Sequence, residues 1–196
     1  MLQHLLTYAE KRGLVAEEGF NEKRPLKWLI SFDGQGRNPQ VILLGDGKSG
    51  QERRCPDAGT KAQGKEGAHF LADKLSTIVL YDQGSDKPST DNLKFNFFVD
   101  MLQRASSVMP LLSAAANALN SSENITSICR QLKQMKKSSA KDSDFATLQI
   151  GQTILLDCPE WIDWWRKEFR LQRVTHEKKS NKDGVKMRCL LTGELI

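Results

Sequence analysis

The chain has 196 residues and a formal net charge of +5, and 39% of its residues are hydrophobic. This length and composition fit one globular domain with its own core and exclude an intrinsically disordered chain. No apolar run reaches the length of about 18 residues that a membrane-spanning helix needs. The first ten residues, MLQHLLTYAE, lack the basic start of a secretory signal, so we expect a cytoplasmic protein.

The spacing of cysteines and histidines argues against zinc or redox chemistry. The cysteines lie far apart, no Cys-x-x-Cys pair is present, and the histidines are equally scattered. We therefore expect free thiols in a reducing compartment, no metal site and no cofactor. The residues concerned are Cys55, Cys129, Cys158 and Cys189, with His4, His69 and His176.

The N-terminal part of the chain predicts a helix followed by a β-hairpin. Apolar residues recur at helical spacing in residues 1–12, and a polar connection follows over 14–23. Two apolar β-type runs, Leu26–Phe32 and Val41–Leu44, flank a segment rich in Asp and Gly, which is typical of an antiparallel hairpin. Arg53–Pro56 can add a short edge strand.

A short helix is expected over Ala68–Leu80, and three amphipathic helices follow it. Each of the three places apolar side chains three and four residues apart, so that they share one face. Asn120 and Glu123 have the spacing of a capping box for the third helix. The three expected helices are Leu93–Ala105, Pro110–Leu119 and Ser121–Lys137.

The C-terminal part predicts a second hairpin and a tryptophan-rich helix. Phe145–Ile150 and Thr153–Leu156 are the expected strands, and a helix begins at Asp157 with a proline in its first turn. A basic loop over 176–184 and a strand over 185–191 follow. Because the tryptophans have helical spacing, we expect them in the core, with base stacking as the alternative. They are Trp161, Trp164 and Trp165.

Strands at both ends and helices between them predict the fold class. We expect a single α+β domain over residues 1–196, with antiparallel β-hairpins at both ends packed with a helical middle, rather than a parallel doubly wound sheet. Its parts are the hairpin with a basic Gly-rich loop (1–92), the helical segment (93–137), and the second hairpin, Trp-rich helix and terminal strand (145–196).

A glycine-rich loop with many cations follows the first hairpin. Residues 45–67 hold five basic and four acidic residues, a net charge of +1. Glycine lets backbone approach a ligand closely, and Lys and Arg attract phosphate, although a solvated loop without function is the alternative. Gly45–Gly50 matches the glycine pattern of dinucleotide-binding folds without the required helix, and Gly47–Ser49 ends a P-loop pattern without its leading glycine. We therefore expect no enzyme.

The remaining charge is distributed unevenly. Residues 130–141 hold five basic residues and no acid, and residues 166–182 hold seven basic and two acidic residues. These windows together carry +10, so the rest of the chain carries −5. Such asymmetry suggests an anionic partner, and two solvated basic faces are the alternative.

Several landmarks occur in an order that resembles one known family. They are MLQHLLTYAE, the hairpin PLKWLISFDGQGR…VILLG, ERRCPD, FLADKLSTIVL, PEWIDWWRKEF and RCLLTGE. Together they resemble the N-terminal part of the large subunit of the type I-C CRISPR interference complex, Cascade. Family members continue beyond RCLLTGE, so the resemblance implies an N-terminal fragment of a larger subunit. Gly67-Ala-His69 departs from the Pro-Asn that often precedes the family's Phe-Leu-x-Asp element.

The resemblance implies a role in prokaryotic antiviral defence. A large subunit of this family binds double-stranded DNA, recognises the protospacer-adjacent motif and touches the crRNA-capped end of the complex. It also contacts other Cascade subunits and the recruited helicase-nuclease, without membrane contact. It is not itself a nuclease, and this sequence agrees, because it has no metal-carboxylate cluster and no nucleophile–base motif.

DNA binding would then be divided between two groups of side chains, because phosphate contacts position a duplex and base-edge contacts specify its sequence. Arg53 and Arg54 are adjacent on a strand and should face opposite ways. The residues nominated for phosphate are Lys133, Lys136, Lys137, Arg166, Arg170 and Lys178. Those nominated to recognise the motif are Lys48, Arg53, Arg54, Lys61 and Lys65, with Gln51 and Gln63 as amide readers.

A second hypothesis is that the chain is a protein-interaction module. Its basic loop would dock a neighbouring Cascade subunit or the helicase-nuclease, with little DNA contact of its own. A small cytosolic enzyme is the third hypothesis, and no constellation of residues supports it. Charge reversal at Lys48 or Lys61 separates the first two, because it should weaken motif preference in one case and subunit assembly in the other.

Overall fold

The computed structural model describes His4 and residues 17–46, 48–64, 67–84, 92–135 and 139–180. For Lys61, Gln63 and residues 174–180 it describes the backbone alone. The strand expected over 185–191, and the helix expected over 1–12 apart from His4, lie outside the described residues.

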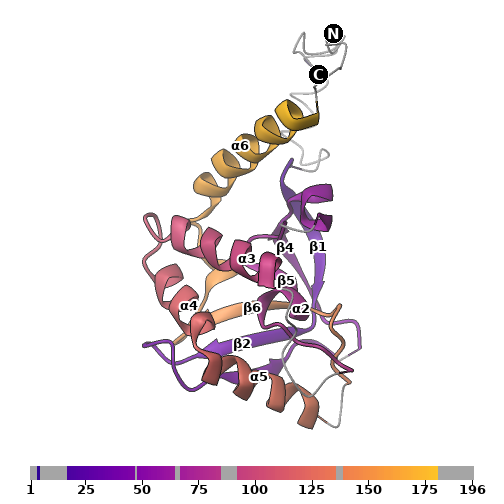
Figure 1. The fold of residues 1–196 in the computed structure, drawn as a ribbon, viewed down its shortest axis with the longest axis vertical. Helices are drawn as coiled ribbons and strands as arrows, with labels where there is room; N and C mark the ends of the chain where they lie inside the picture. The colour runs from indigo at the N-terminus through magenta and orange to yellow at the C-terminus, as the bar shows by residue number, and fades with distance from the viewer. Residues whose placement is uncertain are drawn as a thin grey trace.

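Two β-sheets organise the described chain, which is α+β as expected (Figure 1). The smaller sheet pairs β1 (Phe20–Leu26) with β4 (Gln51–Pro56) antiparallel, with an irregular register between Asn21 and Arg24. The larger sheet has the order β3-β2-β6-β5, and β7 pairs with β6. Its strands are β2 (Trp28–Phe32), β3 (Gln40–Leu43), β5 (Ala72–Lys74), β6 (Phe145–Ile150) and β7 (Thr153–Ile154).

Both expected hairpins are present, and they join into one sheet. β2 pairs antiparallel with β3, and β6 with β7. The sheet also holds one parallel pair that the hairpin patterns do not predict, because β2 and β6 run parallel with Trp28 opposite Ala146 and Phe32 opposite Ile150. A parallel pair needs a long crossover connection, and the helical middle of the chain supplies it.

The middle helices confirm the amphipathic pattern (Figure 1). α3 packs on α4, α4 on α5 and β6, and α5 on β3. The Ser121 hydroxyl caps α5 by accepting the Asn124 N–H at 3.3 Å. The expected cap at Asn120 is therefore wrong, since Asn120 is the last residue of α4. The helices are α3 (Asn92–Ala105), α4 (Leu111–Asn120) and α5 (Ser122–Gln134).

Two further expectations need correction because strand pairing overrides the local pattern. Part of the helix expected over Ala68–Leu80 is β5, whose three residues pair with β6, so only α2 (Leu75–Ile78) is helical. The polar connection expected over 14–23 includes the first residues of β1. Glu22 and Lys23 of this part are exposed and Asn21 is half-buried, so a strand with polar residues forms here.

The tryptophan-rich helix, α6 (Ile162–Ser180), begins later and ends later than expected. The short 3-10 helix η2 (Leu155–Asp157) holds Asp157, the expected helix start. At the other end, α6 continues through residues 176–180, where a loop was expected. A second 3-10 helix, η1 (Gly59–Gln63), lies in the glycine-rich segment.

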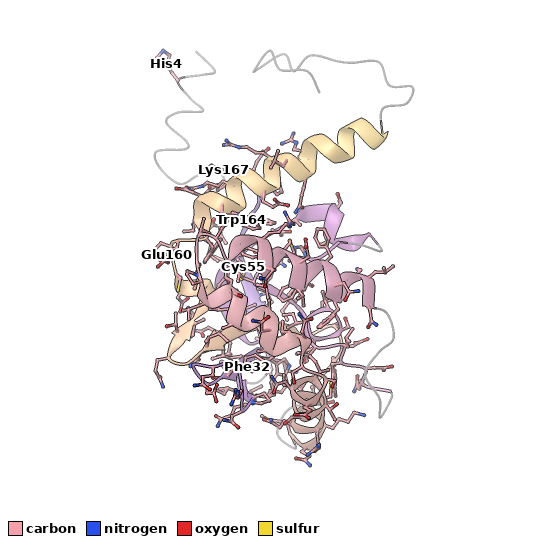
Figure 2. All side chains as sticks on the ribbon, turned by 60° about the vertical axis from the view of Figure 1, so that its left-hand side comes forward. His4, Phe32, Cys55, Glu160, Trp164 and Lys167 are labelled. Carbon is pink, nitrogen blue, oxygen red and sulfur yellow. The ribbon has the colours of Figure 1, made fainter. Side chains whose placement is uncertain are left out.

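An aromatic cluster fixes α6 on the rest of the chain. The Phe70 ring stacks on Trp165 at 5.7 Å between centroids and contacts Trp164 at 5.0 Å. The Trp165 indole N–H donates to the Gly19 carbonyl at 2.7 Å. The expected core role is confirmed for Trp161 and Trp165, which are buried, whereas Trp164 is half-buried. Trp164 lies on the inner side of α6 and Lys167 on its outer side (Figure 2).

Among the described helices, none combines the length and the apolar character that crossing a bilayer requires. The described cysteines, Cys55, Cys129 and Cys158, are free thiols, as expected.

The turn before β4 generates one prediction. Gly50 has φ +76°, and an added Cβ would lie 2.5 Å from the Leu26 carbonyl oxygen. Gly50→Ala should therefore lower the free energy of unfolding by about 1–3 kcal/mol. In Gly34→Ala nothing lies within 4 Å of the added atom, so this control should change it by less than about 0.5 kcal/mol. Equal effects in urea titrations would contradict the turn's role.

The buried thiols generate a second prediction. Burial raises the pKa of Cys55 to about 12 and that of Cys129 to about 11. Because the thiolate is the reactive form, iodoacetamide at pH 8 should modify Cys55 at least about 100-fold more slowly in the folded chain than in urea. Peptide mass spectrometry measures both rates, and rapid labelling of folded Cys55 would contradict its placement in the core.

Candidate nucleic-acid interface

The described part of the glycine-rich segment holds β4 and η1. Ahead of β4, the Asp46 carboxylate accepts the N–H groups of Lys48 at 2.9 Å and Ser49 at 2.8 Å. Lys48 and Gln51 are exposed at this turn and at the start of β4. Two of the nominated motif readers are therefore presented by a backbone that strand pairing and Asp46 hold in place.

The two adjacent arginines of β4 have different partners, as strand alternation predicts. Arg53 Nη1 lies 2.6 Å from Asp157 Oδ1. Arg54 forms ion pairs with Glu22, at 3.0 Å, and with Glu17. Both guanidinium groups thus have carboxylate partners within the chain, and a DNA phosphate would have to compete with these carboxylates.

Arg166 of α6 shares one of these partners. Its guanidinium lies 2.6 Å from Glu17 and 2.8 Å from Asp163. The hydrogen bond from Arg166 outweighs the effect of burial and, with Arg54, lowers the pKa of Glu17. The Glu17 carboxylate thereby links the β1–β4 sheet to α6.

The nominated phosphate contacts do not form one patch among the described residues. Lys133 is exposed near the end of α5 and Arg170 is exposed on α6, and these helices lie at opposite ends of the described chain (Figure 1). The side chains of the other nominated residues lie outside the described ones. These are Lys61, Gln63, Lys65, Lys136, Lys137 and Lys178.

A buried ionic cluster that we did not predict lies beneath the glycine-rich segment. Arg24 on β1 is only 5% exposed, and its Nη2 donates to Asp57 Oδ2 at 2.7 Å. Asp57 Oδ1 lies 3.2 Å from His69 Nδ1, which also accepts the Ala58 N–H at 3.1 Å. Asp73 accepts the backbone N–H of His69 at 2.6 Å. The cluster ties β1, β5 and both ends of η1 together.

The pKa values of the two carboxylates of this cluster, Asp57 and Asp73, are shifted in opposite directions. Burial opposes ionisation of Asp57, but the contact with His69, the Gly59 N–H and the Arg24 charge together lower its pKa well below the ordinary value. Burial dominates at Asp73 and raises its pKa, although His69 and two backbone N–H groups act the other way.

A cavity of about 330 Å³ opens beside the cluster. It lies between the segment after η1, β5 with α2, the start of α3, and the first residue of β6. Its lining includes two lysines, one histidine and one carboxylate, so its formal charge is not negative. The residues that line it include His69, Asp73, Lys74, Thr77, Lys94 and Phe145.

Sequence reasoning missed this cavity because its residues come from four separate segments. Gly67-Ala-His69 and the following FLAD element were noticed as a sequence pattern, but no periodicity places His69 beside Asp57. The available signal was Asp73, an acid within an apolar run of the sequence. A carboxylate in such a run is expected to be buried and therefore to have polar partners nearby.

The described residues contain no group of three or more His, Cys, Asp or Glu side chains placed to hold a metal ion. A family model described as CRISPR-associated protein (Cas_Csd1) matches residues 3–195. A search of curated proteins gave no match.

The buried ion pair generates a prediction about stability. Arg24→Met leaves Asp57 without its guanidinium partner and should lower the free energy of unfolding at pH 7 by about 3 kcal/mol. The control Arg37→Met, at an exposed position, should change it by less than about 0.5 kcal/mol. Urea titrations measure both.

The pH dependence of this difference follows from the lowered pKa of Asp57. The ion pair contributes fully above about pH 4, the ordinary pKa of Asp, and its contribution is lost as the pH falls toward the folded-state pKa. The difference in free energy of unfolding between the parent chain and Arg24→Met should therefore become smaller below about pH 4. A difference that grows in acid would contradict the ion pair between Arg24 and Asp57.

Proposed function

Because the chain belongs to the Cas_Csd1 family of CRISPR-associated proteins, we propose that it binds double-stranded DNA and recognises the protospacer-adjacent motif. It would do so as part of the large subunit of a type I-C Cascade complex. Its further partners under this proposal are crRNA, the other Cascade subunits and the recruited helicase-nuclease.

The observation that carries the proposal is the turn before β4. It presents Lys48, whose side chain is exposed, on a backbone held by Asp46 and by the pairing of β4 with β1. Exposed Gln51 follows at the first position of β4. A lysine and an amide beside the start of a paired strand are suited to reading a groove, because base contacts need side chains on a positioned backbone whereas phosphate contacts tolerate motion.

The protein-interaction hypothesis has its own support. Arg53, Arg54 and Arg166 have carboxylate partners within the chain, which reduces the charge available to DNA. Val108 and Leu111 are 41% and 36% exposed beside the α3–α4 connection, where apolar side chains suit a protein partner. A chain that docks subunits through this connection would leave DNA to other parts of the complex.

Charge reversal in the turn tests the proposal. Fluorescence anisotropy at physiological salt would compare short duplexes with and without a type I-C motif. The chain should prefer the motif duplex, and Lys48→Glu should weaken binding to it by about 1–3 kcal/mol, the value of a specific base contact. Arg37→Glu is the matched control, since it reverses an exposed charge in a different turn and should leave the motif preference unchanged.

Equal affinity for both duplexes that falls steeply as the salt concentration is raised would contradict motif recognition and indicate sequence-independent binding to phosphates. If the chain does not bind DNA, and Val108→Asp abolishes its binding to the neighbouring Cascade subunits in a pull-down, the protein-interaction hypothesis is supported instead.

A further inference from the structure

The wall of the cavity beside the buried cluster carries a hydroxyl group. Thr77 is 4% exposed and lines the cavity. A threonine hydroxyl has one donor and two acceptor lone pairs, so it can form a hydrogen bond with a polar atom of an occupant.

The charges on the cavity wall favour an anion. The Lys74 side chain is exposed and has no ion-pair partner among the described residues. Lys94 Nζ donates to the Ala62 carbonyl at 3.1 Å, which uses one of its three N–H donors. The opposing acid, Asp73, already accepts the backbone N–H groups of His69 and Lys74, each at 2.6 Å. Two ammonium groups thus remain available to an anion.

One wall of the cavity is aromatic. The Phe145 ring lies 6.2 Å from the His69 ring, centroid to centroid, with their planes tilted by 52°. The Arg24 guanidinium covers the Phe145 ring at 4.7 Å, and Arg24 Nη1 is buried without a hydrogen-bond partner. Aromatic faces next to cations are the pattern by which proteins bind unpaired bases and their phosphates.

The size of the cavity limits its occupant. A volume of about 330 Å³ would hold on the order of ten water molecules, and lies at the small end of ligand pockets. This is more room than a lone phosphate ion needs and too little for a stretch of duplex. A single nucleotide, with one phosphate and one flat base, matches both the size and the two kinds of wall.

We propose that this cavity binds one unpaired nucleotide of a DNA strand, with its phosphate at Lys74 and Lys94 and its base against Phe145. Thr77 donates to the nucleotide, and Asp73 favours a base with an exocyclic amino group, because a carboxylate accepts from such groups. This inference rests on the proposed function and extends it, since it assigns a binding site for a nucleotide that is displaced when a duplex opens.

Competition between matched duplexes tests this nucleotide-binding site. The probes are a fully paired duplex, the same duplex with one unpaired cytidine, and a third with an abasic site in place of that cytidine. The chain should bind the cytidine duplex at least about tenfold more tightly than the other two, which corresponds to one charge-assisted contact and one stacked base. Lys74→Gln and Thr77→Val should each abolish this preference, and thermal melting would verify that both fold.

Lys23→Gln is the control, because Lys23 is exposed on β1 and outside the cavity lining; it should keep the preference. Equal binding of all three duplexes, or a preference that survives both cavity substitutions, would overturn the nucleotide-binding site while leaving the proposed function standing. Competition by inorganic phosphate that equals competition by the cytidine duplex would also overturn it in favour of a simple anion site. An absence of binding to any duplex would contradict the proposed function itself.

Discussion

The structure depends on the ion pair between Arg24 and Asp57. Arg24 reaches from β1 into the core, and a buried guanidinium is tolerable only with a carboxylate and an aromatic face beside it. Asp57 in turn contacts the His69 ring, and the backbone N–H of His69 donates to the Asp73 carboxylate. This chain of contacts closes the segment between β4 and β5 onto both sheets. Two members of this chain of contacts, His69 and Asp73, also line the cavity.

Local patterns predicted most of the fold, and long-range pairing decided the rest. The three middle helices and both hairpins followed from apolar periodicity and turn residues, which act over a few positions. The parallel pairing of β2 with β6 joins residues more than a hundred positions apart, and nothing in either strand specifies its partner. Long-range pairing also explains β5, whose sequence has helical spacing but whose three residues form a strand because they pair with β6.

The interface was harder to predict than the fold because charge in a sequence does not say whether it is already paired. Lys48 and Gln51 are exposed as a binding role requires, whereas Arg53, Arg54 and Arg166 have carboxylate partners far from them in sequence. Basic residues can thus build a structure as well as bind a ligand. The cavity residues were missed for the opposite reason, since single lysines and a threonine in ordinary surroundings give no pattern until the fold assembles them.

The most direct measurement of the central claim is hydrogen–deuterium exchange of the full chain with and without a short motif duplex. If the turn before β4 and the cavity form the nucleic-acid interface, the duplex should slow exchange in residues 45–51 and 67–78 and leave residues 106–112 unchanged. Slower exchange confined to 106–112, or none in 45–51 and 67–78 under conditions where the duplex is bound, would contradict the account and place DNA elsewhere on the chain.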